Sequence, residues 1–269
     1  MNLSEVKLVV SDMDGTLLNN NSEVSDRFFK QFEDLKKRNI HFVAASGRQY
    51  QSIVHKLDSI KHDISIIAEN GGLMQHKSEI NILLKLSSED VFKSIEILRK
   101  IPDCFIVLCG RKAAYIETND AEFISKFSEY YNAYEIVDDL TQVSNDDFMK
   151  IAVYHFESSE GCILPNISGL TEDYQITVSG QNWLDISHKD ANKGYALNML
   201  QKDMGISKNE TMVFGDYNND LHMLELAHFS YAMENAHANV KKTANFETKS
   251  NMNEGVETVL EALINSKPI

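Results

Sequence analysis

The chain has few of the residues that stabilise small secreted domains or bind zinc. Its 269 residues include only three cysteines, Cys104, Cys109 and Cys162, and no two of them form a CxxC pair. An odd number of cysteines without that spacing argues against a disulfide framework and against a zinc site. The nine histidines form no HExxH motif. This cysteine usage agrees with a reducing compartment.

Positive charge and long apolar runs are also scarce. The 26 Lys and Arg residues stand against 40 Asp and Glu residues, which gives a formal net charge of −14. Nucleic acid and anionic membranes would repel such a chain, whereas a local cation can still admit a small anionic substrate. No apolar run approaches the roughly 18 residues of a membrane helix, and the first residues do not resemble a signal peptide. We therefore expect a cytoplasmic protein without a nucleic-acid or membrane partner, and no protein partner is inferred.

Apolar strands alternate with helices in the first part of the chain. With 43% hydrophobic residues, the chain is long enough for one large or two medium domains. Strands are expected at residues 6–11, 40–46 and 64–72, and helices at 25–39 and 49–57. Short, nearly continuous apolar strands that alternate with helices predict a parallel, doubly wound sheet.

The pattern changes after residue 82. Helices are expected at residues 87–100 and 120–132, and a strand at 148–156. Two further pairs of segments are typical of hairpins: "CFIVLCG" with "AAYIET", and "YQITVSG" with "NWLDIS". Adjacent strands with interspersed helices predict a smaller α+β module over residues 83–189.

The first pattern resumes at residue 190. Expected elements are helices at 192–205, 219–228 and 253–264 and strands at 210–216 and 229–234. The fold class is therefore predicted as α/β, with a Rossmann-like doubly wound parallel-sheet core and an inserted smaller α+β domain. The core would comprise residues 1–82 and 190–269.

Four short motifs stand where strands of this core end or where a helix begins. They are "DMDGT" (12–16), "SGR" (46–48), "NKG" (192–194) and "GDYNND" (215–220). Each one alone could be an ordinary turn or helix cap, since short motifs match by chance. In open α/β sheets, however, ligands bind at the carboxyl ends of the strands. Four such motifs in this order are hard to explain as turns.

With these motifs the chain resembles the haloacid dehalogenase superfamily phosphatases, specifically the Cof-type group with a large C2-type α/β cap after the third strand. The resemblance rests on "DMDGTLL", "ASGR", "NKGYAL", "FGDYNNDLHML" and "AMENA". It implies a Mg²⁺-dependent phosphatase that hydrolyses small phosphorylated metabolites, sugar phosphates first, and phosphorylated cofactors such as FMN or pyridoxal phosphate next. It also implies that residues 83–189 form the cap.

The two aspartates of the first motif account for the chemistry that this resemblance implies. Asp12 would be the nucleophile, because a carboxylate is already ionised at neutral pH and needs no activating base. Attack would give an aspartyl phosphate, which water then cleaves. Asp14 would protonate the leaving oxygen and later deprotonate the water, since side chains at i and i+2 of an extended chain point the same way.

The remaining residues would supply positive charge and hold the phosphate. Asp12 and Asp216 are the expected carboxylate ligands of Mg²⁺, and the family pattern adds the main-chain carbonyl of Asp14. Lys193 would be the second cation. The other phosphate ligands would be the Ser46 hydroxyl, the Met13 and Gly47 backbone N–H groups and the Asn219 amide.

A few residues would lie behind or beside these ligands. Asp220 and Thr16 are expected to orient them, Asp220 through Lys193 or a metal-bound water. Arg48, Trp183 and the "ENGG" turn (69–72) could lie near the cleft between the domains. Arg48 could contact the substrate or its phosphate, or be a surface charge at a helix start. Trp183 is expected to pack at the domain junction rather than to stack on substrate, and "NGG" is expected to be a plain turn rather than a phosphate cradle.

Two other functions compete with a phosphatase. A phosphomutase of the phosphomannomutase type would use the same aspartyl phosphate, but the compact "GDYNND" motif favours the phosphatases. A non-enzymatic binding protein on the same scaffold is disfavoured, because Asp12, Asp14, Lys193 and Asp216 are all present.

Overall fold

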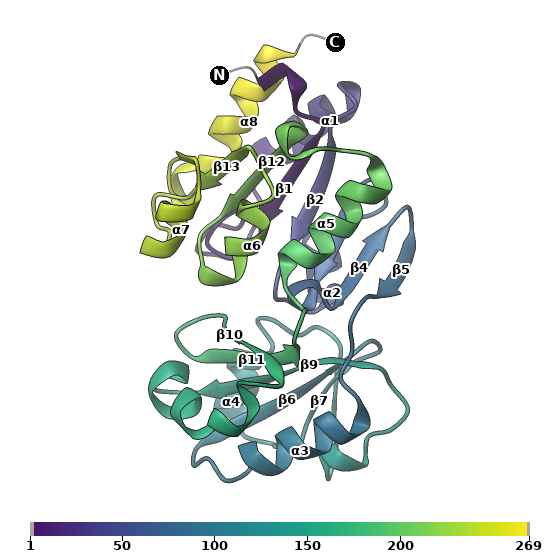
Figure 1. Ribbon diagram of the computed structural model, residues 1–269, viewed down its shortest axis with the longest axis vertical. Coiled ribbons are helices and arrows are strands. Elements are labelled where there is room, and N and C mark those ends of the chain that lie inside the picture. The colour runs from purple at the N-terminus through teal and green to yellow at the C-terminus, as the bar shows by residue number, and fades with distance from the viewer. Residues whose placement is uncertain (1–2, 268–269) are drawn as a thin grey trace.

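The computed structural model describes residues 3–267, and within them the strands form two sheets, one above the other in Figure 1. Residues 1, 2, 268 and 269, the outermost ends of the predicted core segments, lie outside the described residues. No helix among the described residues is long and apolar enough to cross a membrane.

The larger sheet has the order β14-β13-β12-β1-β2-β3-β4-β5. Its parallel strands are β1 (Leu8–Asp12), β2 (His41–Ala45), β3 (Ser65–Ala68), β12 (Thr211–Gly215), β13 (Phe229–Ala232) and β14 (Phe246–Glu247). Two antiparallel strands, β4 (Leu73–His76) and β5 (Glu79–Ile82), extend one edge. The parallel, doubly wound sheet is thus confirmed, whereas the β4–β5 hairpin was not predicted.

Helices cover both faces of this sheet. Val9 packs with α1 (Asp26–Lys37) and α8 (Gly255–Ser266), while its neighbours Leu8 and Val10 pack with α5 (Lys193–Met204) on the other face. Three shorter helices are α2 (Tyr50–Lys56), α6 (Leu221–Leu224) and α7 (Ala238–Thr243). The expected helix at 219–228 is shorter than predicted, and α7 was not predicted. Strands buried on both faces explain why the sequence there is almost continuously apolar.

The smaller sheet has the order β10-β11-β9-β6-β7-β8. Its strands are β6 (Cys104–Gly110), β7 (Ala114–Ile116), β8 (Tyr134–Ile136), β9 (Phe148–His155), β10 (Tyr174–Val178) and β11 (Trp183–His188), and its helices are α3 (Ser88–Leu98) and α4 (Ala121–Phe127). The pairs β6–β7 and β10–β11 are antiparallel, as the two predicted hairpins require. The strand β8, which runs parallel to β7, was not predicted.

The chain passes between the two sheets twice. It leaves the larger sheet after β5, which ends at Ile82, and returns between His188 and Lys193. We propose residues 83–189 as the cap domain and refer to them below as the cap. The carboxyl ends of β1, β2 and β12 lie at the edge of the core that faces the cap (Figure 1), and β3, which is parallel to β2, ends at the same edge. A ligand at those strand ends would be enclosed between the two units.

Candidate active site

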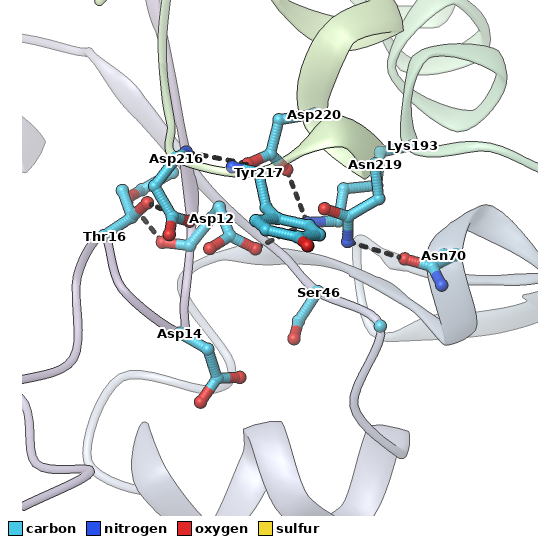
Figure 2. Close-up of polar contacts among 12 residues, drawn as sticks. Asp12, Asp14, Thr16, Ser46, Asn70, Lys193, Asp216, Tyr217, Asn219 and Asp220 are labelled. Carbon is cyan, nitrogen blue, oxygen red and sulfur yellow. Dashed lines mark hydrogen bonds and ion pairs between the residues drawn. The ribbon is translucent and has the colours of Figure 1, made fainter. Parts of the chain in front are cut away.

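Lys193 and Asp12 form a buried ion pair at the carboxyl end of β1. Asp12 is the last residue of β1, and Lys193 is the first residue of α5. The Lys193 Nζ lies 2.5 Å from Asp12 Oδ1 and 2.6 Å from Asp220 Oδ1 (Figure 2). Because the Lys193 side chain is 0% exposed, it is not a solvated surface lysine.

The "NKG" motif explains how this lysine reaches the site. The Asn192 side chain accepts a hydrogen bond of 2.8 Å from the Tyr195 backbone N–H and so starts α5 at Lys193. A Cβ at Gly194 would lie 2.6 Å from the Cβ of His222. Glycine therefore lets α5 approach the segment after β12 closely enough for Lys193 to meet Asp220.

Three carboxylates gather around this lysine. Oxygens of Asp12, Asp216 and Asp220 lie within 4.8 Å of one another. Asp216 Oδ1 accepts a hydrogen bond of 3.1 Å from the Thr16 hydroxyl. A Cβ at Gly15 would lie 2.2 Å from Asp216 Oδ2, and the φ of Gly15 is +74°. Glycine at this position is what allows the first motif to lie against Asp216.

Asp220 has a different environment from the other two carboxylates. Besides Lys193, it accepts hydrogen bonds of 2.9 and 3.1 Å from the backbone N–H groups of Asp216 and Tyr217. These contacts hold the loop after β12 and orient Lys193 from behind. Asp220 thus lies where the sequence predicted a group that supports the lysine.

Two carboxylates of this cluster, those of Asp12 and Asp216, have raised pKa values. Burial raises the pKa of Asp12 well above its ordinary value, and Asp220 and Asp216 add to the effect while Lys193 opposes it. Burial and the charge of Asp220 raise the pKa of Asp216 to about 7. One lysine does not balance three carboxylates, so a further cation would stabilise them. Oxygen ligands of this type fit Mg²⁺.

Asp14 points away from the Asp12–Lys193 pair (Figure 2). The expectation that the Asp12 and Asp14 side chains point the same way is therefore wrong, because β1 ends at Asp12 and Asp14 lies beyond the extended strand. Its carboxylate is bound by Arg48, with Nε 2.7 Å from Oδ2 and Nη2 2.6 Å from Oδ1. Arg48 is buried, and its guanidinium also donates to the Glu129 carbonyl and lies 4.6 Å from the centre of the Tyr130 ring. Glu129 and Tyr130 belong to the cap, so the alternative that Arg48 is a surface charge is wrong.

The residues predicted to bind phosphate lie on neighbouring loops. Ser46 follows β2, and its hydroxyl accepts a hydrogen bond of 3.1 Å from the backbone N–H of Arg48. Met13 is buried directly after Asp12. Asn219 donates to the Asn70 side chain at 3.1 Å, and Gly47 packs against the same asparagine. The structure thus brings all the predicted phosphate ligands to one end of the sheet.

A cavity of about 330 Å³ separates the core from the cap. Asp12, Asp14, Ser46 and Asp216 line it from the core, and Tyr130, Tyr154 and Trp183 are among the cap residues that line it. Trp183 packs against Tyr130 and Tyr154 with ring centres 5.8 and 4.8 Å apart. Trp183 was expected to pack at the domain junction. It packs instead within an aromatic cluster of the cap and also lines the cavity.

Four residues at this junction were not predicted as part of the site: Glu69, Asn70, Lys150 and Asp185. Asn70 and Glu69 belong to the "ENGG" turn, which is buried against the cap rather than a plain turn. Lys150 and Asp185 are single charged residues inside the apolar strands β9 and β11. A lone charge in an apolar strand was the one signal in the sequence that could have indicated Lys150 and Asp185.

The geometry can be compared with known proteins. A model of the haloacid dehalogenase-like hydrolase family matches residues 9–260. The 5-amino-6-(5-phospho-D-ribitylamino)uracil phosphatase of Escherichia coli K12 is 31% identical over 262 residues, which cover 96% of each chain. A solved structure from Streptococcus mutans UA159 has a TM-score of 0.89 and 32% identity, and the match covers 97% of this chain and 99% of that one.

A solved sugar phosphatase of subclass IIB of the superfamily has a TM-score of 0.81 at 22% identity, and the match covers 96% of this chain and 98% of that one. That likeness concerns the fold. The chain belongs to the haloacid dehalogenase-like hydrolase family. Within the family it is a phosphatase, a hydrolase of phosphoric monoesters, and the resemblance to the Cof-type phosphatases is confirmed.

Proposed function

We propose that the protein hydrolyses small phosphorylated metabolites through a phosphoryl group carried transiently by Asp12. The observation that carries this proposal is the buried Asp12–Lys193 pair, of which Asp12 lines the cavity between the core and the cap. A buried carboxylate beside a fixed ammonium suits an acceptor of an anionic phosphoryl group, because the lysine offsets the repulsion between the two anions.

The proposed reaction has two steps. In the first, an Asp12 carboxylate oxygen bonds to phosphorus while the bond from phosphorus to the leaving oxygen breaks, and Asp14 gives that oxygen a proton. In the second, water attacks phosphorus, its proton goes to Asp14, and the bond to Asp12 breaks. Lys193 donates to the phosphoryl group throughout, and Ser46, Asn219 and the N–H groups of Met13 and Gly47 bind the other phosphoryl oxygens.

Mg²⁺ fits the acidic cluster and would be held by the carboxylates of Asp12 and Asp216 and by the main-chain carbonyl of Asp14. Once bound, it would neutralise charge on the transferring phosphoryl group. Asp220 also lies in the cluster, but its oxygens already serve Lys193 and two backbone N–H groups. We therefore assign Asp220, with Thr16, to orienting the groups that bind.

Sugar phosphates are the first proposed substrates, with FMN or pyridoxal phosphate as the alternative. The E. coli relative is named for a phosphorylated ribitylaminouracil, which supports a small phosphorylated molecule as substrate. That relative is named a phosphatase, which favours hydrolysis over the phosphomutase alternative. The three cysteines are free thiols, in keeping with the proposed cytoplasmic location.

The test is phosphate release from a panel of phosphorylated metabolites with Mg²⁺, together with rapid-quench trapping of the phosphoenzyme. Asp12→Asn should be inactive on every substrate, because an amide is a poor nucleophile. Asp14→Asn should give a burst of p-nitrophenolate from p-nitrophenyl phosphate and accumulate a chain with one added phosphoryl group by intact mass. A variant that turns over normally without Asp12 would overturn the proposal.

A further inference from the structure

The turn that follows β3 has an unusual backbone. Glu69, Asn70 and Gly71 all have positive φ, of 51°, 52° and 95°. Non-glycine residues rarely adopt this conformation, and it persists where the surroundings fix it. A Cβ at Gly71 would lie 2.3 Å from the carbonyl oxygen of Asn192. The turn is therefore packed directly against the residue that precedes Lys193.

Asn70 connects the cap to the proposed phosphate site. Its amide nitrogen donates to Asp185 Oδ2 of the cap at 2.7 Å. Its amide oxygen accepts from the Asn219 Nδ2 at 3.1 Å, the contact drawn in Figure 2. Because one planar amide makes both contacts, a shift of Asp185 would turn Asn70 and move the hydrogen-bond partner of Asn219.

Lys150 makes a second connection from the cap. Its Nζ donates to the Gly47 carbonyl at 2.6 Å and lies 3.1 Å from Glu69 Oε2 and 3.3 Å from Asp185 Oδ1. The side chains of these three charged residues are no more than 3% exposed. Burial alone would lower the pKa of Lys150, but Asp185 and Glu69 raise it above its ordinary value. The lysine thus stays charged and fixed between the cap and the loop after β2.

We propose that Asp185 and Lys150 are positioning residues of the phosphate site, acting through Asn70 on Asn219 and through the Gly47 carbonyl on the loop at residues 46–48. This inference rests on the proposed function. It means that the cap does more than choose the leaving group, because two of its residues complete the binding site for the phosphoryl group itself. Buried, mutually paired charges suit this task, since they are stable only in one arrangement.

Two other roles are distinguishable by experiment. Asp185 and Lys150 also line the cavity, so they could contact the leaving group of the substrate. Alternatively, Asp185 and Lys150 could have a purely structural role and hold the cap in place. A leaving-group contact would matter for a hexose phosphate and not for inorganic phosphate, whereas a positioning role would affect both. A purely structural role would lower stability without any specific coupling to Asn219.

The experiment measures binding of inorganic phosphate by titration calorimetry in the presence of MgCl₂, with Asp185→Ala, Asn219→Ala and the double variant. Calorimetry needs no turnover, so it tests the positioning role even if the metabolite panel fails. We expect Asp185→Ala to weaken phosphate binding about tenfold, the size of effect expected for one misplaced hydrogen bond. In the Asn219→Ala background the same change should have almost no further effect. Steady-state KM should rise by the same factor for p-nitrophenyl phosphate and for a hexose phosphate.

Asp185→Asn is the conservative variant, because its amide oxygen can still accept from Asn70, and it should recover most of the phosphate affinity. Asp146→Ala is the matched control: it removes a cap carboxylate that accepts from the Tyr115 hydroxyl at 3.0 Å and should leave phosphate binding unchanged. If Asp185→Ala does not fold, Asn70→Ala breaks the same connection from the core side.

Fully additive losses in the double variant would overturn the proposal. So would a loss confined to the hexose phosphate, which would make Asp185 a contact of the leaving group. Unchanged phosphate binding in both Asp185→Ala and Asn70→Ala would likewise overturn it.

Discussion

Arg48 holds the carboxylate of Asp14 by two hydrogen bonds, from Nε and Nη2 at 2.7 and 2.6 Å. The same guanidinium donates to the carbonyl of Glu129 and lies over the ring of Tyr130, both in the cap. The orientation of the proposed acid/base residue therefore depends on contacts that Arg48 makes with the cap. A planar guanidinium can do this because its donors form a rigid fork.

Arg48→Lys should separate orientation from charge. Lysine keeps the positive charge but cannot hold Asp14 at two points. We expect kcat for a sugar phosphate to fall about tenfold or more, because its alkoxide needs a proton to leave and general acid help is worth about 10²–10⁴-fold. p-Nitrophenyl phosphate should be affected much less in its first step. Arg27→Lys, at an exposed ion pair with Glu254, is the control, and equal slowing of the first step with both substrates would contradict this role.

Lys193→Met should affect both catalysis and stability. Loss of the donor to the phosphoryl group is expected to lower kcat/KM at least about a hundredfold. Because Lys193 is wholly buried between Asp12 and Asp220, its loss also leaves two carboxylates unpaired. Breaking such a pair typically costs about 3–5 kcal/mol of unfolding free energy. Urea unfolding and steady-state kinetics measure the two effects.

A second replacement separates these effects of Lys193. The variant Lys193→Met with Asp220→Asn should regain part of the lost stability, because one unpaired charge is removed, but it should regain no activity. Lys202→Met, on an exposed position of the same helix, should change neither property. Near-normal kinetics of Lys193→Met would show that the lysine does not act on the phosphoryl group.

The core could be predicted from the sequence because its strands are buried on both faces. Leu8, Val9 and Val10 face two different apolar clusters, so no polar residue interrupts this part of β1. The hairpin of β4 and β5 lacks that signal, since β5 is almost entirely exposed. Its turn places Lys77 and Ser78 at positive φ, where Asn-Gly would be the recognisable pair. The hairpin was therefore missed because its second strand is not apolar and its turn lacks the residues typical of such turns.

The site was predictable only where a short motif encodes it. Asp12, Lys193 and Asp216 each belong to such a motif, with a glycine that permits the close approach seen in the structure. The contacts of Asp185 and Lys150 with the "ENGG" turn join residues 115 and 81 positions apart. Spacing along the chain carries no information about contacts of that kind.

Removal of divalent metal should abolish activity. EDTA is expected to stop phosphate release, and added Mg²⁺ should restore it, because the acidic cluster has one lysine for three carboxylates. Asp216→Asn should raise the Mg²⁺ concentration needed for half-maximal rate by tenfold or more, roughly the effect of losing one ligand or its close support. Activity in a fully chelated sample would contradict the proposed metal dependence.

Folding stability should depend on pH through His41, at a distance from the active site. His41 Nε2 lies 2.8 Å from the Ser65 hydroxyl, which lies 2.6 Å from His76 Nδ1. Burial, and after it the charges of His76 and Lys77, lower the pKa of His41 from 6.5 to about 4. Between these values the unfolded chain binds a proton that the folded chain does not. The unfolding free energy should therefore fall as the pH falls from 6.5 towards 4, and the effect of His41 should vanish above 7.

The measurement compares urea unfolding of the wild type and of His41→Gln from pH 4.5 to 7.5. Carboxylates titrate at the acid end in both proteins, so the informative quantity is the difference between the two unfolding free energies. Glutamine cannot take up a proton, so this difference should change by at most about 3 kcal/mol across the window, at about 1.4 kcal/mol per pKa unit. Parallel curves for the wild type and His41→Gln would show that His41 titrates alike in the folded and unfolded chains.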